Sequence, residues 1–192
     1  MDKVDNIKLK ISEYERIFSQ NNYNGDVSNS NSFSYKQGSI PIILSSGHCV
    51  NQTRLGKLKV ADTYTGSLIN ILHDLTDCHI IYKLKNDGVD VNFDNIEEDG
   101  GYKKFLSNVI KDNNIKLLID VHGAAKWREF GLEIGSSNGY TLSQEKLDLI
   151  IDHFKNYDID IIANTVFPAT FENTVTKSIK NLTNIETFQL EI

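Results

Sequence analysis

From residue 40 onward, short apolar runs alternate with longer segments in which apolar residues recur at helical spacing. The runs that predict strands are 41–45, 78–82, 117–121, 130–134, 159–163 and 187–191. The segments that predict helices are 59–75, 102–113 and 143–153. Strands alternating with helices predict an α/β domain with a mixed, mostly parallel sheet.

The N-terminal part of the chain has a weaker pattern. Residues 7–18 mix apolar and charged positions without a clean period, which fits a short strand or a helix. Residues 19–34 are rich in Asn, Ser and Gly and predict a flexible, exposed loop that either covers a site or is a plain surface segment. We therefore expect a single domain, 1–192, in which an N-terminal segment (1–39) precedes the core (40–192).

Composition narrows the class of protein. The 192 residues are 40% hydrophobic and 24% charged, as in ordinary globular chains. A net charge of −6 without a Lys/Arg cluster argues against nucleic acid as a partner. No apolar run approaches the ~20 residues of a membrane span, and the N-terminus lacks a signal-peptide pattern. With two cysteines, too few for a disulfide framework, a cytoplasmic protein without a membrane partner is expected.

Two histidines stand directly after apolar strand runs. His48 follows Ser46-Gly47, and His122 ends the most apolar run of the chain and precedes Gly123. Ligands of open α/β sheets bind beyond the carboxyl ends of strands, where both histidines fall. Taken alone, His48 also fits an ordinary loop histidine, whereas His122 is the stronger candidate. Two histidines and one carboxylate can hold Zn²⁺ and leave a position open for water.

Three carboxylates are candidates to complete such a site. Asp62 lies where the chain enters a predicted helix, so it is either a metal ligand or a helix-capping residue. Asp120 stands two residues before His122, which on a strand places both on one face and lets Asp120 support the ligand. Glu191 ends an alternating run and is either the base that deprotonates metal-bound water or a charge on a solvated strand face. No serine-hydrolase elbow and no phosphate-binding loop occurs.

In their order along the chain, these motifs resemble the N-formylglutamate amidohydrolase family, a relative of the zinc carboxypeptidases. The matching stretches are Ser46-Gly47-His48, Arg54 with Lys59, 61–66, Asp90-Val91-Asn92, Asp120-Val121-His122-Gly123, Glu133-Ile134-Gly135 and 189–192. The resemblance implies a three-layer, phosphorylase/hydrolase-like fold.

The resemblance also implies a chemistry. It implies one zinc ion held by His48, Asp62 and His122, with Glu191 as the catalytic glutamate. Metal-bound water would then hydrolyse the amide bond of an N-acyl amino acid, such as an N-formyl one, or of a small peptide. Arg54 or Arg128 would polarise the carbonyl group or hold a substrate carboxylate. Asn92 would support the ligands or contact the substrate.

Two departures from the family pattern keep an alternative open. Phe93 follows Asn92, where family members often carry an arginine, and the sequence stops one residue after Glu191. A glutamate at a fraying end is poorly held unless its strand is locked into the sheet. The alternative is a non-catalytic relative that binds a ligand or partner at the same cleft.

Overall fold

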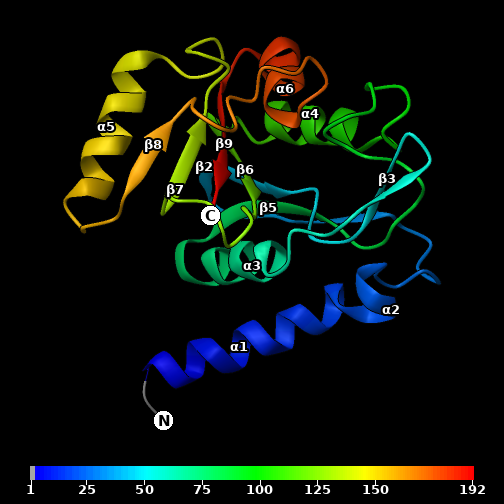
Figure 1. The fold of residues 1–192 in the computed structure, drawn as a ribbon. Coiled ribbons are helices and arrows are strands. Elements are labelled where there is room, and N and C mark those ends of the chain that lie inside the picture. The colour runs from blue at the N-terminus through cyan, green and yellow to red at the C-terminus, as the bar shows by residue number, and fades with distance from the viewer. Residues whose placement is uncertain (1–2) are drawn as a thin grey trace.

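The computed structural model describes residues 3–192, which form one seven-stranded sheet with helices on both faces (Figure 1). In sheet order the strands are β1 (Phe33–Lys36), β5 (Cys78–Lys83), β2 (Ile40–Ser46), β6 (Leu117–His122), β9 (Glu186–Glu191), β7 (Leu132–Gly135) and β8 (Ile161–Ala163). β1 runs antiparallel to β5 and β7 antiparallel to β9, whereas the other neighbouring strands are parallel. The predicted α/β fold with a mixed, mostly parallel sheet is confirmed.

Helices complete the layers on each side of the sheet. They are α1 (Lys3–Phe18), α2 (Gln20–Tyr23), α3 (Thr65–Thr76), α4 (Tyr102–Asp112), α5 (Gln144–Lys155) and α6 (Val175–Thr183). Figure 1 shows α3 on one side of the sheet and α4 with α6 on the other, while α5 lies beside β8 and α1 packs outside α3. No helix within residues 3–192 is both long enough and apolar enough to cross a membrane.

The central strands carry apolar side chains on both faces because both faces are covered. Leu118 packs in the cluster with Leu106 and Ile179 of α4 and α6, whereas Val121 packs in the cluster with Ile69 of α3. Successive strand residues point to opposite faces, so Asp120 and His122 share the α4/α6 side with Leu118. The polar residues at the end of β6 therefore project above the α4/α6 core.

The helix predicted for 59–75 begins later than its apolar spacing suggested. Residues 57–59 form β4 (Lys57–Lys59), which pairs with β3 (Gln52–Arg54) in a two-stranded hairpin. Its turn residues, Leu55 and Gly56, have φ of 51° and 73°, and two successive positive φ values are what a tight type I′ turn requires. Tyr64 is also left-handed, with φ of 68°, so α3 begins only at Thr65.

Other segments also differ from the sequence expectation. Residues 3–18 form a helix, which decides between strand and helix for 7–18. The Asn/Ser-rich segment 19–34 contains α2 and the start of β1 and is therefore only partly a loop. It is hydrogen-bonded to the core: Asn51 donates its backbone N–H to Tyr23 O (2.7 Å) and its amide to Asn22 O (2.9 Å). The short amphipathic helix α6 was not among the predicted helices.

Strand β9 lies inside the sheet, between β6 and β7. Glu191 is in register with His122 on one side and with Glu133 on the other. Its side chain is 4% exposed. The fraying that its place in the sequence suggested is therefore absent, because the strand is hydrogen-bonded along both edges.

Candidate metal centre

His48 and His122 reach the same place from two neighbouring parallel strands. His122 ends β6, and His48 lies in the turn directly after β2. Gly47 in this turn leaves room for the Val91 side chain, since a Cβ atom there would lie 2.3 Å from Val91 Cγ2. Both imidazoles are buried, and their ring centroids are 4.8 Å apart.

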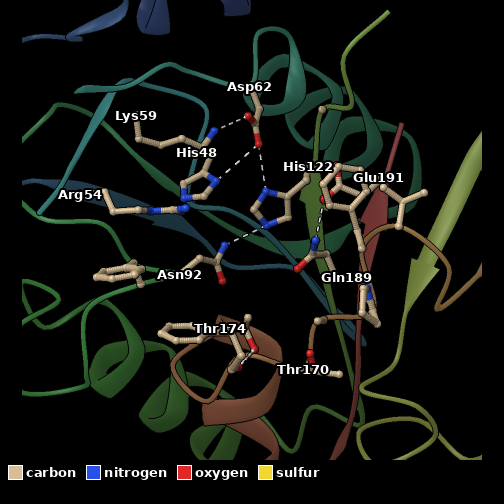
Figure 2. Close-up of a pocket in the computed structure, with 17 residues that line it drawn as sticks. His48, Arg54, Lys59, Asp62, Asn92, His122, Thr170, Thr174, Gln189 and Glu191 are labelled. Carbon is tan, nitrogen blue, oxygen red and sulfur yellow. Dashed lines mark hydrogen bonds and ion pairs between the residues drawn. The ribbon is translucent and has the colours of Figure 1, made fainter. Parts of the chain in front are cut away.

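Asp62 joins the two histidines as the third member of the cluster (Figure 2). Its Oδ2 lies 2.9 Å from His122 Nδ1 and 3.5 Å from His48 Nδ1. One ligand atom from each of the three residues lies within 4.8 Å of the others. The sequence placed these residues 14 and 60 positions apart, and the fold brings them together.

The loop that carries Asp62 is fixed at several points. Asp62 donates its backbone N–H to His48 O (2.8 Å), and Thr65 Oγ1 donates to Asp62 O (2.7 Å). Asn51 Oδ1 accepts the N–H of Ala61 (2.9 Å), and Glu15 of α1 accepts the N–H of Tyr64 (3.1 Å). The N-terminal helix and the Asn-rich segment, through Asn51, thus hold the Asp62 loop in position.

A second carboxylate stands behind each histidine. Asp120 Oδ2 lies 2.9 Å from His122 Nε2, as predicted from their spacing, and Asp90 Oδ1 lies 2.8 Å from His48 Nε2. A carboxylate at Nε2 keeps the proton on that nitrogen and leaves Nδ1 free to bind a metal. Both Nδ1 atoms face Asp62, so both histidines are prepared as ligands through the same atom.

Asn92 completes the support of His122. Its Oδ1 accepts the N–H of Val175 at the start of α6 (2.7 Å), which fixes the orientation of the amide. The Nδ2 group therefore points to the other side, 3.2 Å from Asp120 Oδ2 and 2.9 Å from His122 Nε2. When His122 Nε2 carries the proton, it donates to Asp120 and cannot accept a hydrogen bond. The Asn92 amide then donates to the Asp120 carboxylate as well.

The electrostatics of the cluster favour a positive charge between these groups. Burial opposes the charged form of His122, but Asp120 and Asp62 outweigh it and raise the pKa of His122 well above its ordinary value. Burial likewise opposes the charged form of Asp62, yet hydrogen bonds and charges of His122 and His48 lower its pKa strongly. The pKa of Asp90 is also lowered, because His48 and Arg54 outweigh its burial.

The donor set fits a divalent cation. Two imidazole nitrogens and one carboxylate form a common catalytic zinc set, which leaves a coordination position open. The four carboxylates in and beside the cluster are Asp62, Asp90, Asp120 and Glu191. Within residues 3–192, Arg54 and Lys59 are the two cationic side chains that line the same cavity. With neutral imidazoles the site therefore has an excess of negative charge that a doubly charged ion offsets.

Glu191 faces the same cavity from the neighbouring strand β9 (Figure 2). It accepts a hydrogen bond from Gln189 Nε2 at 2.5 Å. Burial raises the pKa of Glu191, the charge of His122 lowers it, and that of Asp62 raises it, with a net upward shift. A carboxyl group with a raised pKa beside a metal-ligand cluster is suited to accept and return a proton.

The two predicted arginines lie in different places. Arg54 lines the cavity, and its Nε donates to Asp90 Oδ2 (2.8 Å). Arg128 does not line it: its guanidinium stacks 4.1 Å from the Trp127 ring centroid and 5.0 Å from that of Phe167, a cavity-lining residue. Lys59 also lines the cavity and donates to Asp62 Oδ1 (2.8 Å).

The far wall of the cavity comes from the segment between β8 and α6, which the sequence did not indicate. Glu133 of β7 is fully buried, and its Oε1 accepts the N–H groups of Thr165, Val166 and Phe167 at 2.6–2.9 Å. Its Oε2 is buried without a partner among the described residues. One carboxylate therefore holds the start of the segment that closes a cavity of about 480 Å³.

No family model matches the chain, and no curated protein matches it in sequence. Solved structures match it in fold. An N-formylglutamate amidohydrolase from Ralstonia eutropha JMP134 has a TM-score of 0.56 and 10% identity over 84% of this chain and 85% of that one. A bacteriophage poly-gamma-glutamate hydrolase has a TM-score of 0.53 and 15% identity over 85% and 72% of the two chains. A metallo-carboxypeptidase from Pseudomonas aeruginosa has a TM-score of 0.52 and 10% identity over 96% and 58%. The chain therefore has the fold of these hydrolases, as the resemblance of its motifs implied.

Proposed function

We propose that the protein is a zinc-dependent hydrolase that cleaves the amide bond of an N-acyl amino acid or a small peptide. The observation that carries the proposal is the convergence of His48, Asp62 and His122 with Glu191 at one cavity. The fold shared with an N-formylglutamate amidohydrolase and a metallo-carboxypeptidase supports the same reaction class.

Each residue has a defined task in this proposal. His48, Asp62 and His122 hold the metal, and Asp90 with Asp120 keeps each imidazole in the metal-binding tautomer. When bound, zinc supplies Lewis acidity, which lowers the pKa of water and polarises a carbonyl group. Glu191 accepts a proton from the attacking water.

The reaction balances as simple hydrolysis. The water oxygen adds to the carbonyl carbon, the C–N bond breaks, and the amine leaves with the proton that Glu191 returns to its nitrogen. The products are a carboxylate and an amine. Of the two arginines, Arg54 is assigned to the carbonyl oxygen or the substrate carboxylate, because its terminal nitrogens have no partner among residues 3–192. Arg128, which contacts the Phe167 ring but does not line the cavity, receives no role in the reaction.

The proposal is tested by measuring metal content and turnover on the same samples. Protein prepared without chelator should hold about one equivalent of zinc, and His122→Ala should lose it. Glu191→Gln should keep the zinc but lose about 10²–10⁴-fold in turnover of N-acyl amino acids and short peptides, the usual contribution of a general base. Glu172→Gln changes an exposed glutamate next to Phe171 of the cavity lining; it is the matched control and should behave as the unmodified protein.

Two outcomes would contradict the proposal. Protein that neither contains nor takes up zinc lacks the proposed centre. Normal zinc content without hydrolysis of any substrate in the panel would instead support a non-catalytic relative that binds a ligand at this cavity.

A further inference from the structure

The cavity has two chemically different sides. The metal-ligand cluster and Glu191 form the polar side. Opposite them stands an uncharged wall, which we call the apolar wall: Phe93, Val166, Phe167, Pro168, Ala169 and Phe171. A substrate whose amide lies at the metal-ligand cluster therefore places other parts of the molecule against apolar side chains.

Two rings of the apolar wall form a stack. Phe93 and Phe171 have ring centroids 5.4 Å apart and planes inclined by only 13°. Phe171 is 48% exposed, although a phenylalanine ring gains free energy when it is buried. An aromatic ring that joins this stack covers the exposed part of Phe171 and gains the offset-stacking contact that aromatic pairs favour.

Arg54 adds a cation to the same part of the cavity. Its guanidinium carbon lies 5.2 Å from the Phe93 ring centroid, and its Nε is fixed by Asp90. The terminal nitrogens, without a partner among residues 3–192, can bind a carboxylate in two-pronged fashion. The cavity thus presents an anion-binding group next to an aromatic surface.

The apolar wall is held in place before any substrate binds. Glu133 fixes its first residues through the N–H groups of 165–167. Asn173 Nδ2 donates to Phe93 O (2.9 Å), which ties the segment of Phe171 to that of Phe93. Gly135 lets this segment approach β7 closely, since a Cβ there would lie 2.3 Å from Phe167 O. A preformed surface loses little entropy on binding and so discriminates between ligands.

We propose that this cavity selects substrates in which an aromatic or large apolar side chain stands next to a carboxylate, and rejects those with an acidic side chain. This inference rests on the proposed function and names its substrate class. A second carboxylate against the apolar wall is desolvated without a free cationic partner among the side chains that line the cavity. Lys59 is already paired with Asp62 and Val60 O, and Arg128, which contacts the Phe167 ring, does not line the cavity.

The test measures binding of two small acids that contain no amide bond, 3-phenylpropanoate and glutarate. Calorimetric titration into the zinc-loaded full chain should show at least about tenfold tighter binding of 3-phenylpropanoate, the size expected for a buried apolar group against an unpaired charge. Phe171→Ala should remove most of this preference. Phe171→Arg should reverse it in favour of glutarate, since it puts a cation on the apolar wall. Tyr157→Ala, which removes an exposed aromatic residue that does not line the cavity, is the control and should leave the preference unchanged.

The outcomes separate this inference from the proposed function. A preference for 3-phenylpropanoate that depends on Phe171, in protein that hydrolyses nothing, supports the selectivity and contradicts the hydrolase. Equal binding of both acids, tighter binding of glutarate, or a preference unaffected by Phe171→Ala overturns the selectivity. Hydrolysis of N-formylglutamate at least as fast as of N-formylphenylalanine would overturn it as well, while the hydrolase proposal would stand.

Discussion

Glu133 offers the sharpest test of how the cavity wall is built, because one buried oxygen serves three backbone donors. We consider Glu133→Gln, which keeps the shape of the side chain and removes its charge. Hydrogen bonds to a charged group contribute about 1.5–3 kcal/mol and neutral ones about 0.5–1.5 kcal/mol. Each of the three bonds to residues 165–167 then weakens by about 1 kcal/mol.

We therefore expect Glu133→Gln to lower the free energy of unfolding by about 2–3 kcal/mol. The loss does not exceed the sum of the three bonds, because removing a buried charge also removes part of its desolvation cost. In a protein of this size, such a change lowers Tm by roughly 5–10 °C. Urea unfolding of the metal-free protein, followed by circular dichroism, measures the free energy. Hydrogen exchange at the amides of Thr165, Val166 and Phe167 locates the effect.

The control is Glu172→Gln, which removes a charge from the same segment. Its exposed carboxylate pairs with Lys177 (2.7 Å) and accepts a long hydrogen bond from Asn181 Nδ2 (3.4 Å). That variant should change stability by less than about 0.5 kcal/mol. If Glu133→Gln is as stable as the unmodified protein, or if its three amides exchange no faster, the carboxylate does not hold the wall and the reasoning fails.

Three further predictions follow from the site. Asp120→Asn should weaken zinc affinity about 10–100-fold, because the variant has no carboxylate to hold the proton on His122 Nε2. Competition with a chromophoric chelator measures the Kd, and an unchanged Kd would refute the prediction. Gly47→Ala should cost about 1–3 kcal/mol by overpacking against Val91, and adding Val91→Ala should restore part of the loss in denaturant titrations. The pKa of Asp90 lies below that of an unfolded aspartate, so the stability that its ionised form contributes is present above pH ~4 and is lost as pH falls further. Asp90→Asn should therefore make the stability of the metal-free protein depend less on pH between pH ~5 and ~2. An unchanged slope in that range would contradict this.

The parts of the site that sequence reasoning found are those that local geometry fixes. Asp120 and His122 are two residues apart on one strand, so the strand period alone places them on one face. Parallel strands then bring the ends of β2 and β6 together, which places His48 beside His122.

What the sequence did not reveal depends on contacts between distant loops. Asp90 belongs to one of the matching motifs, but it lies 42 residues after His48 in an irregular segment, so no spacing predicts that the two side chains pair. Likewise, nothing local indicates that Glu133 of one strand binds the backbone at 165–167. Arg128 is the opposite case: its chemistry suited the site, but its guanidinium stacks on Trp127 and Phe167 and does not line the cavity.

The interior position of β9 has a consequence for synthesis on the ribosome. β7, α5 and β8 leave the ribosome before β9, yet in the finished sheet β9 alone connects them to β6. Until residues 186–191 are available, the edges of β6 and β7 are open in addition to the outer edges at β1 and β8, and they can pair with other chains. The same short strand places Glu191 beside the metal-ligand cluster. Closure of the sheet and completion of the candidate site therefore occur in the same step of folding.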